Sequence, residues 1–431
     1  MTSAAPVKRR DLKELLALRS PLVTPDLARS RWLNDLRDDA MTALSERLLP
    51  TTRDEEWRFT DIKALVDLSL QPPQVTTVAP EALERYRIPD ALQLVFVDGR
   101  YVSELSSDAE VNGLTVGPLL SWNGPDLTPY LGQQQGLERT FTGLNAASFI
   151  DAAVIWADPE AVIEQPVHLL YVSTTNDAAL THPRALVVAG AQSQLTLVED
   201  FVAVGEGTYV TNSVTELYLA ENAGLTHLRL QRDSGEAYHF GKTAVSQQRD
   251  SRYVGHAISL GGKLSRHNPE VFQQGPQTET TLNSLTIATG QQLADTHSLI
   301  RYDHPHGSSS QLHKCIVGDR AHGVFNGKVL VPQAAQMTDA GQLNRNLMLS
   351  SKARIDTKPQ LEIVADNVKC THGATVSQLD PAELFYLQSR GIDAARAQTL
   401  LVRAFAGEII DALPIEAVRS QMVVCVASLA P

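Results

Sequence analysis

Cysteine is scarce in this chain, which has three in 431 residues, at positions 315, 370 and 425. They form no C-x-x-C pair, and an odd number of thiols makes no complete disulfide framework. Single thiols of this kind are typical of a reducing compartment, in which each one is packed, reactive or a metal ligand. We therefore expect a cytoplasmic protein.

Long hydrophobic runs and excess basic charge are also lacking. No apolar run approaches the ~20 residues of a membrane-spanning helix, and charged residues interrupt MTSAAPVKRRDLKELLALRSP where a signal peptide would be apolar. Lys and Arg number 37 against 49 Asp and Glu, a net charge of −12. Because nucleic acids and anionic lipid surfaces require a basic footprint, we expect neither a nucleic acid nor a membrane as partner.

Several motifs of catalysis and nucleotide binding are missing. The sequence contains no GxxxxGK[ST], G-x-S-x-G or H-E-x-x-H, and no dinucleotide-binding fingerprint opens a βα unit. We therefore expect this chain to bind no nucleotide through a P-loop.

The first 92 residues are predicted to form a helical domain. Thr24-Pro25-Asp26 is typical of a helix start, with a capping hydroxyl, a proline at the first helical position and an acid in the first turn. Leu33, Leu36 and Leu44 follow at helical spacing, and Pro50 ends the run.

A small segment of mixed α/β character, 93–149, is expected to connect this domain to the rest of the chain. Around its start, LQLVFVDGRYVSEL consists of two apolar runs on either side of Asp98-Gly99. This arrangement predicts a β-hairpin.

Residues 150–378 are nearly all short β-like runs separated by small turn residues, such as Glu221-Asn222-Ala223-Gly224. No helical pattern of ten or more residues interrupts them, which leaves a sandwich, a propeller or a stacked β-solenoid. AGAQSQLTLVEDF at 189–201 resembles AENAGLTHLRLQR at 220–232, about one large coil further on. This weak repeat favours the solenoid, in which each coil buries its apolar face on its neighbours. The pattern alone leaves a large irregular sandwich open.

The C-terminal segment, 379–431, returns to helix. Asp380-Pro381 supplies a cap and a first helical position, and Gly391 closes this helix in the left-handed conformation. Asp393 begins a second helix, and a third is predicted near Pro414. A β-solenoid leaves open ends and edges, and we expect the terminal helices to cover them.

His313 and Cys315 are the first of two candidate pairs of metal ligands. On a strand they share a face, because side chains alternate with a period of two. Imidazole and thiolate together suit zinc or iron. A cysteine is also commonly a small buried apolar residue, and we favour core packing for this pair.

Cys370 and His372 are the second pair, in DNVKCTHGATV at 366–376, where we predict a strand that runs into a tight turn at Gly373. If the segment is extended, the two side chains share a face. A structural zinc normally has four protein ligands, so this pair is half of a site. Either a partner completes the site, or the two residues are packed.

The longer run around this pair, DTKPQLEIVADNVKCTHGATVSQLDPAELFYLQSRGI at 356–392, resembles the signature of the SufB/SufD family of the SUF iron–sulfur cluster assembly machinery. EEWRFTDI at 55–62, the FNGK turn at 325–328 and the helix–β–helix order extend the resemblance along the whole chain. The resemblance implies a mainly β fold: a right-handed parallel β-helix core flanked by N-terminal and C-terminal α-helical domains.

Within this family the chain is similar to the SufD members rather than to SufB. Ser350 stands where SufB has a cysteine in an R-N-x-x-Q-C stretch, Gly373 stands where SufB has a glutamate, and Leu387 replaces another cysteine. The retained His372 matches a SufD position implicated in cluster assembly at the interface with SufB. The resemblance therefore implies a ligand or proton-handling role for His372 and an accessory role for the thiol of Cys370.

The resemblance also implies two partners. A SufB-like subunit would form a heterodimer through the β-helix and share a transient iron or iron–sulfur cluster with this chain. A SufC-like ABC ATPase would dock on the C-terminal helices and carry out the ATP hydrolysis, so this chain would be a non-catalytic subunit. The residues of that docking site would be Leu384, Phe385, Tyr386, Arg390 and Gly391.

Two other functions stay open from sequence. The first is a structural β-helix homodimer with no metal role, in which isolated chains pair where the SufB-like subunit would lie. The second is a carbohydrate-active β-helix enzyme, which the lack of a signal peptide disfavours.

Overall fold

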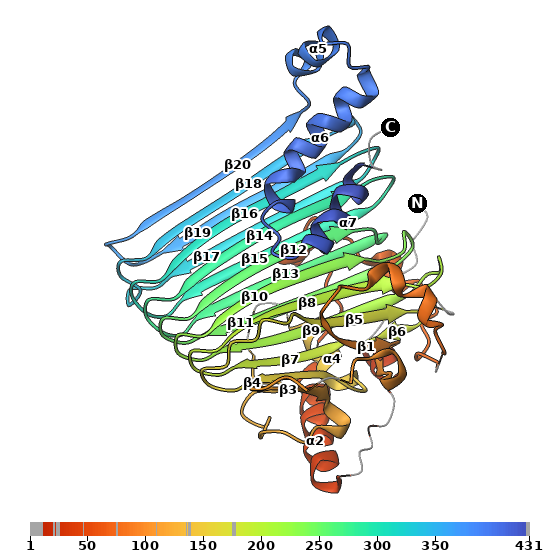
Figure 1. Cartoon of the computed structure of the whole chain (residues 1–431), viewed down its shortest axis with the longest axis vertical. Coiled ribbons are helices and arrows are strands. Elements are labelled where there is room, and N and C mark those ends of the chain that lie inside the picture. The colour runs from red at the N-terminus through yellow and green to blue at the C-terminus, as the bar shows by residue number, and fades with distance from the viewer. Residues whose placement is uncertain are drawn as a thin grey trace, which may run out of the picture.

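The core of the protein is a parallel β-solenoid built from two facing sheets (Figure 1). The computed structural model describes residues 12–19, 22, 26–45, 47–74, 76–108, 110–134, 136, 139–174 and 178–427. Sheet I has the strand order β2-β1-β5-β8-β10-β12-β14-β16-β18-β20, and sheet II has the order β19-β17-β15-β13-β11-β9-β7-β4-β3, with β6 beside β9. From β7 onward successive strands alternate between the sheets. This topology confirms the predicted β-helix and excludes the sandwich and the propeller.

The strands have the following bounds: β1 Leu92–Val97, β2 Arg100–Tyr101, β3 Leu114–Pro118, β4 Ala153–Ala157, β5 Val167–Ser173, β6 Leu180–Thr181, β7 Arg184–Ala189, β8 Gln194–Ala203, β9 Val210–Leu219, β10 Gly224–Arg232, β11 Tyr238–Gln247, β12 Arg252–Leu260, β13 Leu264–Gln273, β14 Glu279–Ala288, β15 Leu293–Tyr302, β16 Ser308–Val317, β17 His322–Val331, β18 Asp339–Met348, β19 Arg354–Ile363 and β20 Lys369–Gln378. The α-helices are α1 Leu12–Leu16, α2 Leu27–Leu44, α3 Lys63–Val66, α4 Thr140–Ser148, α5 Pro381–Ser389, α6 Ala394–Ile410 and α7 Glu416–Ala427.

Tight turns stack at one corner of the solenoid and fix the rise from coil to coil. Asn222 adopts a φ of 56° and Asp250 a φ of 58°, a left-handed conformation that Asn and Asp tolerate better than most residues. Because of this turn, the N–H of Asn222 donates to Arg249 O at 2.9 Å, and the N–H of Asp250 donates to Pro276 O at 3.1 Å. His306, with a φ of 62°, repeats the arrangement. Each of these turns therefore adds a coil-to-coil hydrogen bond to those of the parallel strand ladders.

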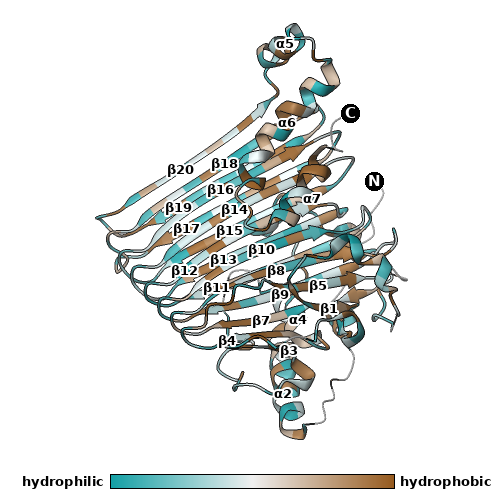
Figure 2. Cartoon of the chain, viewed as in Figure 1, coloured by the Kyte–Doolittle hydropathy of each residue, from teal (hydrophilic) through white to brown (hydrophobic). Residues whose placement is uncertain are grey.

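Helices from the two ends of the chain cover the outer faces of opposite sheets. Near the N-terminus, Leu33 and Phe141 of α2 and α4 belong to apolar clusters on the outside of sheet II. Near the C-terminus, Val402 and Ile409 of α6 pack with Ile316 and other outward residues of sheet I. In Figure 2 the first strands, such as β5 and β7, are largely hydrophobic, whereas β20 is mixed. Within the described residues no helix is long and apolar enough to cross a membrane.

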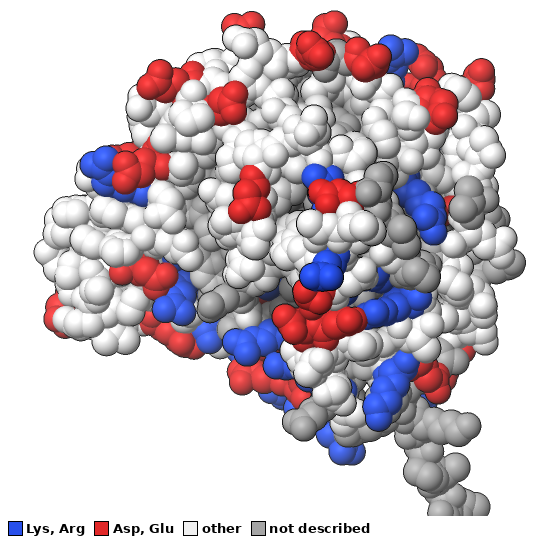
Figure 3. Space-filling model, turned by 90° about the horizontal axis from the view of Figure 1, so that it is seen from below, with Lys and Arg blue, Asp and Glu red and all other residues white. Residues whose placement is uncertain are grey.

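The molecular surface beside the first coils carries both signs of charge. Figure 3 shows Lys and Arg side chains interspersed with Asp and Glu on this face, so no single sign dominates it.

Several local predictions are confirmed. Asp98 and Gly99, with φ of 48° and 81°, form the hairpin between β1 and β2. The carboxylate of Asp380 accepts from the N–H of Ala382 at the start of α5, and Gly391 ends that helix region with a φ of 86°. Asp393 likewise caps α6. The division of the chain into four parts stays a prediction, and β1 extends sheet I by pairing with β5.

Three local predictions are wrong. The helix expected after Thr24-Pro25-Asp26 begins at Leu27, with Asp26 as its cap, because the Asp26 carboxylate accepts from two backbone N–H groups; Thr24 and Pro25 lie outside the described residues. The FNGK segment at 325–328 lies inside β17 and is no turn. Gly373 likewise lies in the middle of β20.

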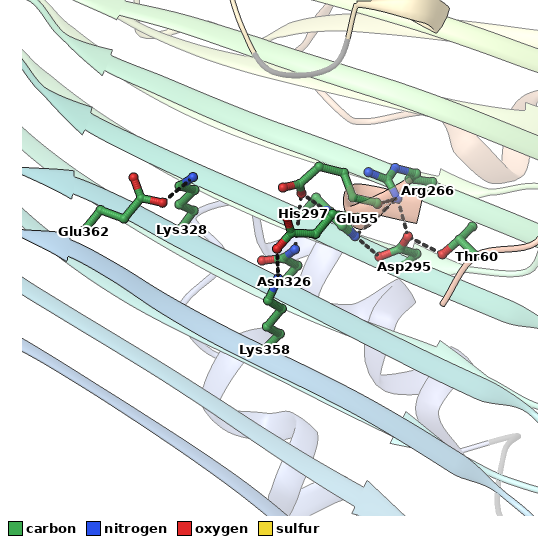
Figure 4. A network of polar contacts seen from close by, with 10 residues as sticks. Glu55, Thr60, Arg266, Asp295, His297, Asn326, Lys328, Lys358 and Glu362 are labelled. Carbon is green, nitrogen blue, oxygen red and sulfur yellow. Dashed lines mark hydrogen bonds and ion pairs between the residues drawn. The ribbon is translucent and has the colours of Figure 1, made fainter. Parts of the chain in front are cut away.

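A polar network fastens the segment at 55–62 to the outer face of sheet II (Figure 4). The buried guanidinium of Arg266 donates to Glu56 O at 2.8 Å and to Asp295 Oδ2 at 2.7 Å, and it lies 3.9 Å from the centre of the Trp57 ring. At the surface, Lys358 Nζ pairs with Glu55 at 2.7 Å. The N-terminal segment therefore reaches β19, the last strand of sheet II.

Replacing Arg266 by Met is expected to lower the free energy of unfolding by about 3–5 kcal/mol, because Asp295 would be left as a buried charge without its guanidinium partner. Urea unfolding measures this effect. Lys358→Met is the matched control, since it removes an exposed ion pair between the same segment and the same sheet and should cost less than about 1 kcal/mol. Equal losses for both variants would contradict the assignment of Arg266 as the main anchor.

Candidate functional site at the open end of the solenoid

At the last coil of the solenoid, each sheet ends in a strand that has one unpaired edge. β20 has β18 as its neighbour in sheet I, and β19 has β17 in sheet II, with no further described strand beyond either one. The residues of both strands are exposed or half-buried, whereas those of the preceding coils are mostly buried. The terminal helices lie on the outer faces, so the expectation that they cover this edge is wrong.

The backbone of β20 presents free hydrogen-bonding groups at this edge. The N–H of Lys369 donates to the carbonyl oxygen of Thr338, directly before β18, at 2.8 Å. In a parallel ladder successive residues bond alternately to the two sides of the strand. The N–H groups of His372 and Ala374 therefore face away from β18, where a further strand would pair.

The register also fixes where Cys370 and His372 point. Cys370 pairs with Ala340 and His372 pairs with Gln342, both of which are buried inside the solenoid. The two predicted residues therefore share the inward face of β20, at a level where no further coil closes the interior. Cys370 is half-buried against the core and His372 is exposed. Burial and the carboxylate of Asp339 raise the pKa of the Cys370 thiol.

The opposite wall of this end comes from β19. Pro359 pairs with Gly327, and Leu361 pairs with Val329 of the apolar core. Beside them Ile363 and Val376 are 41% and 46% exposed. We call the exposed surface of β19 and β20 with these side chains the open end. It combines free strand edges, apolar side chains and two soft ligands.

Two donors are too few to enclose a metal ion. Thiolate and neutral imidazole are ligands that iron and zinc accept. Among the described residues, no three His, Cys, Asp or Glu side chains come together as a group that could hold a metal. Iron or a cluster bound at Cys370 and His372 would therefore need ligands besides these two.

The second predicted pair, His313 and Cys315, lies inside the solenoid. His313 Nδ1 is 2.7 Å from Ser284 Oγ, and its ring lies 4.6 Å from that of Phe325. Burial lowers the pKa of His313 to about 3 and raises the pKa of Cys315 to about 12. Hydrogen bonding and packing account for both positions, and their metal role stays a prediction.

The predicted docking residues lie on or directly after α5, which projects beyond the last coil (Figure 1). This helix buries none of its residues. Phe385 and Tyr386 are 72% and 57% exposed, and the guanidinium of Arg390 lies 5.4 Å from the centre of the Tyr386 ring. Leu384 is half-buried. An exposed pair of aromatic rings on an otherwise uncovered helix is typical of a protein-binding surface.

Sequence reasoning missed Gln342, Pro359 and Leu361, which surround the predicted pair. The coil repeat is the signal that would identify them. The strand register pairs Gln342 with His372, thirty positions later, and Gly327 with Pro359, thirty-two positions later. Without that register, these residues gave no sign of belonging to one end of the molecule.

The fold and this end define a parallel β-solenoid protein with an exposed edge suited to pairing with another chain. A family model described as SUF system FeS cluster assembly, SufBD core domain, matches residues 171–405. Because this match spans more than half of the chain, the chain belongs to the SufBD family of iron–sulfur cluster assembly proteins.

Similar proteins come from several organisms. The chain is 43% identical to an iron–sulfur cluster assembly SufBD family protein of Synechocystis sp., over 96% of this chain and 94% of that protein. It is 35% identical to the chloroplastic protein ABCI7 of Arabidopsis thaliana, over 90% and 84%. It is 32% identical to the iron–sulfur cluster assembly protein SufD of Escherichia coli, over 87% and 88%.

Proposed function

We propose that this chain is a SufD-like, non-catalytic subunit of a complex with a SufB-like subunit and a SufC-like ATPase. The observation that carries the proposal is the open end, where two unpaired strand edges surround Cys370 and His372. A SufB-like solenoid would add its own last coil to these edges, because free N–H and C=O groups are a template for strand pairing. The relative in Escherichia coli that bears the name SufD supports this assignment.

In this complex, nascent clusters would form and iron would enter at the junction of the two solenoids. His372 would supply a neutral imidazole, and Cys370 an accessory thiol, while the partner supplies the remaining ligands of the iron. Pairing of the apolar residues around them, such as Ile363 and Val376, would exclude water. The iron or cluster is cargo of the complex, and nucleotide hydrolysis belongs to the ATPase. We place this assembly in the cytoplasm, where the three free cysteines stay reduced.

The ATPase would dock on α5, and α6 would transmit its movement to the solenoid. Lys314 Nζ of β16 donates to Phe405 O at 2.7 Å and pairs with Glu408 at 2.5 Å, so α6 is fixed to sheet I. Any displacement of α5 would therefore be passed on to strands close to the open end.

Replacing both Phe385 and Tyr386 by Ala is expected to weaken ATPase binding at least tenfold, because exposed aromatic side chains are frequent hot spots of binding. The thermal unfolding temperature should stay the same, since neither ring is buried. Isothermal titration with the purified ATPase measures the affinity. Val424→Ala removes an apolar side chain of similar exposure, 70%, on α7 and serves as control. If that variant binds as weakly as the double variant, the docking surface is elsewhere.

Co-expression with the SufB-like and SufC-like proteins, followed by anaerobic purification, tests the proposal as a whole. We expect one complex that contains all three chains and carries iron and sulfide. If the wild-type chain co-purifies with neither partner, the proposal fails. Stable self-association through the open end, with no iron and no partner, would instead support the structural homodimer.

A further inference from the structure

A small cavity lies on the outer face of sheet II, outside the interior of the solenoid. Its volume is about 100 Å³, and strands β13, β15 and β17 form one side of it. Asn268 belongs to this side, together with Asn326 and Lys328, which Figure 4 shows. Trp57 and Arg139 lie in the segments that form the other side. We call this cavity the outer pocket.

The acidic side chains of the outer pocket already have basic partners. Glu270 Oε2 lies 3.0 Å from Lys242 Nζ, and Glu56 Oε2 lies 3.3 Å from Nδ1 of His297. The hydrogen bond with His297 lowers the pKa of Glu56, so this carboxylate stays ionised and keeps its partner. Neither acid is therefore available to neutralise the remaining cations of the pocket.

Two arginines of the outer pocket lack an acidic partner. Arg266 and Lys328 pair with carboxylates, whereas Arg47 and Arg139 form no ion pair among the described residues. Both are exposed, and only Nε of Arg139 is used, as a donor to Gly136 O at 3.3 Å. In a chain with a net charge of −12, two such guanidinium groups at one cavity favour an anionic ligand.

The strand side of the outer pocket contributes an amide that is almost buried. Asn268 is 5% exposed, and its side chain makes no hydrogen bond to any described residue. Since Asn268 lines the outer pocket, its amide can be reached from there. A buried amide without a partner costs free energy, and a ligand that accepts from its N–H group would remove that cost.

We propose that the outer pocket binds inorganic phosphate. The amide of Asn268 donates from the sheet, and the guanidinium groups of Arg47 and Arg139 donate from the opposite side. Donors on two sides of one cavity suit a tetrahedral oxyanion, and guanidinium groups match its oxygen atoms in pairs. A nucleotide does not fit, because about 100 Å³ is well below the ~300–1,000 Å³ of pockets for larger ligands. The bound anion would join the N-terminal region to sheet II.

Titration of the full chain with sodium phosphate tests the proposal, with sodium chloride adjusted to keep the ionic strength constant. Trp57 lines the outer pocket, so its fluorescence reports binding, and the response should vanish in Trp57→Phe. We expect a saturable change in the wild type. Arg139→Gln and Asn268→Leu should each weaken binding about tenfold or more, because each removes a hydrogen bond to a charged group. Their unfolding temperatures show that both variants are folded.

Arg53→Gln is the matched control. It changes the net charge by the same amount as Arg139→Gln, but Arg53 is exposed outside the outer pocket and its loss should leave binding unchanged. A response that does not saturate overturns the proposal, as does an equal loss in Arg53→Gln. Tighter binding of ADP than of phosphate also overturns it, since the ligand would then be larger than the cavity. The titration needs no partner protein, so its outcome is independent of the proposed function.

Discussion

Replacing His372 by Ala is expected to reduce cluster formation in the three-protein complex more than tenfold while the complex still assembles. His372 is exposed on the inward face of β20, so its removal costs little packing and leaves no buried charge. What would be lost is the imidazole ligand that we propose at the junction of the two solenoids. Loss of a residue that holds a metal ligand by a hydrogen bond typically lowers metal affinity or activity about 10–100-fold, and loss of the ligand itself should lower it at least as much. Iron and sulfide content after anaerobic purification measures the effect.

His304→Ala is the control for this prediction. His304 is exposed as well, but it lies in the turn before β16, away from β20. Its removal should leave cluster content unchanged. If His372→Ala gives a complex with full iron and sulfide, the imidazole has no part in assembly, and the structural homodimer or heterodimer becomes the better interpretation of the open end.

The solenoid could be predicted from sequence because its determinants are local. Turn residues such as Asn222 and Asp250 tolerate a left-handed backbone, and between them ten-residue runs supply one strand each. These features recur along the solenoid, so even a weak repeat favoured the solenoid, although the pattern alone left a large irregular sandwich open. The helix caps at Asp380 and Asp393 are equally local and were also predictable.

The surroundings of the candidate site could not be predicted, because they depend on register between coils. Gly373 looked like a turn residue, yet it lies in β20, where the ladder with β18 overrides its flexibility. Gly327 also looked like a turn residue, yet it lies inside β17, where a Cβ would lie 2.4 Å from Gln342 Nε2 and 2.6 Å from the Phe325 ring. The terminal helices leave the last coil uncovered because they pack on the outer faces of the sheets. An amphipathic sequence shows that a helix has an apolar side, but it does not specify the surface of the solenoid on which that side packs.

Replacing Ala374 by Pro is expected to abolish pairing with the SufB-like solenoid. By the alternation of the ladder, the N–H of Ala374 points away from β18, so a proline there removes no bond within this chain. Its ring would occupy the place of the incoming strand, and one donor of the new ladder would be missing. The opposite edge strand, β19 of sheet II, already contains Pro359, so this end of the solenoid accommodates a proline in an edge strand.

The dissociation constant of the two solenoids should rise at least ~100-fold, which equals about 2.7 kcal/mol. Sedimentation of the purified pair measures it, and the unfolding temperature of the isolated variant should match that of the wild type. Ala374→Ser keeps the N–H and should bind normally. Unchanged association of Ala374→Pro would mean that the partner contacts side chains of the open end without extending its sheets. His372 would then face the partner across an apolar contact, with no strand register to align the ligands.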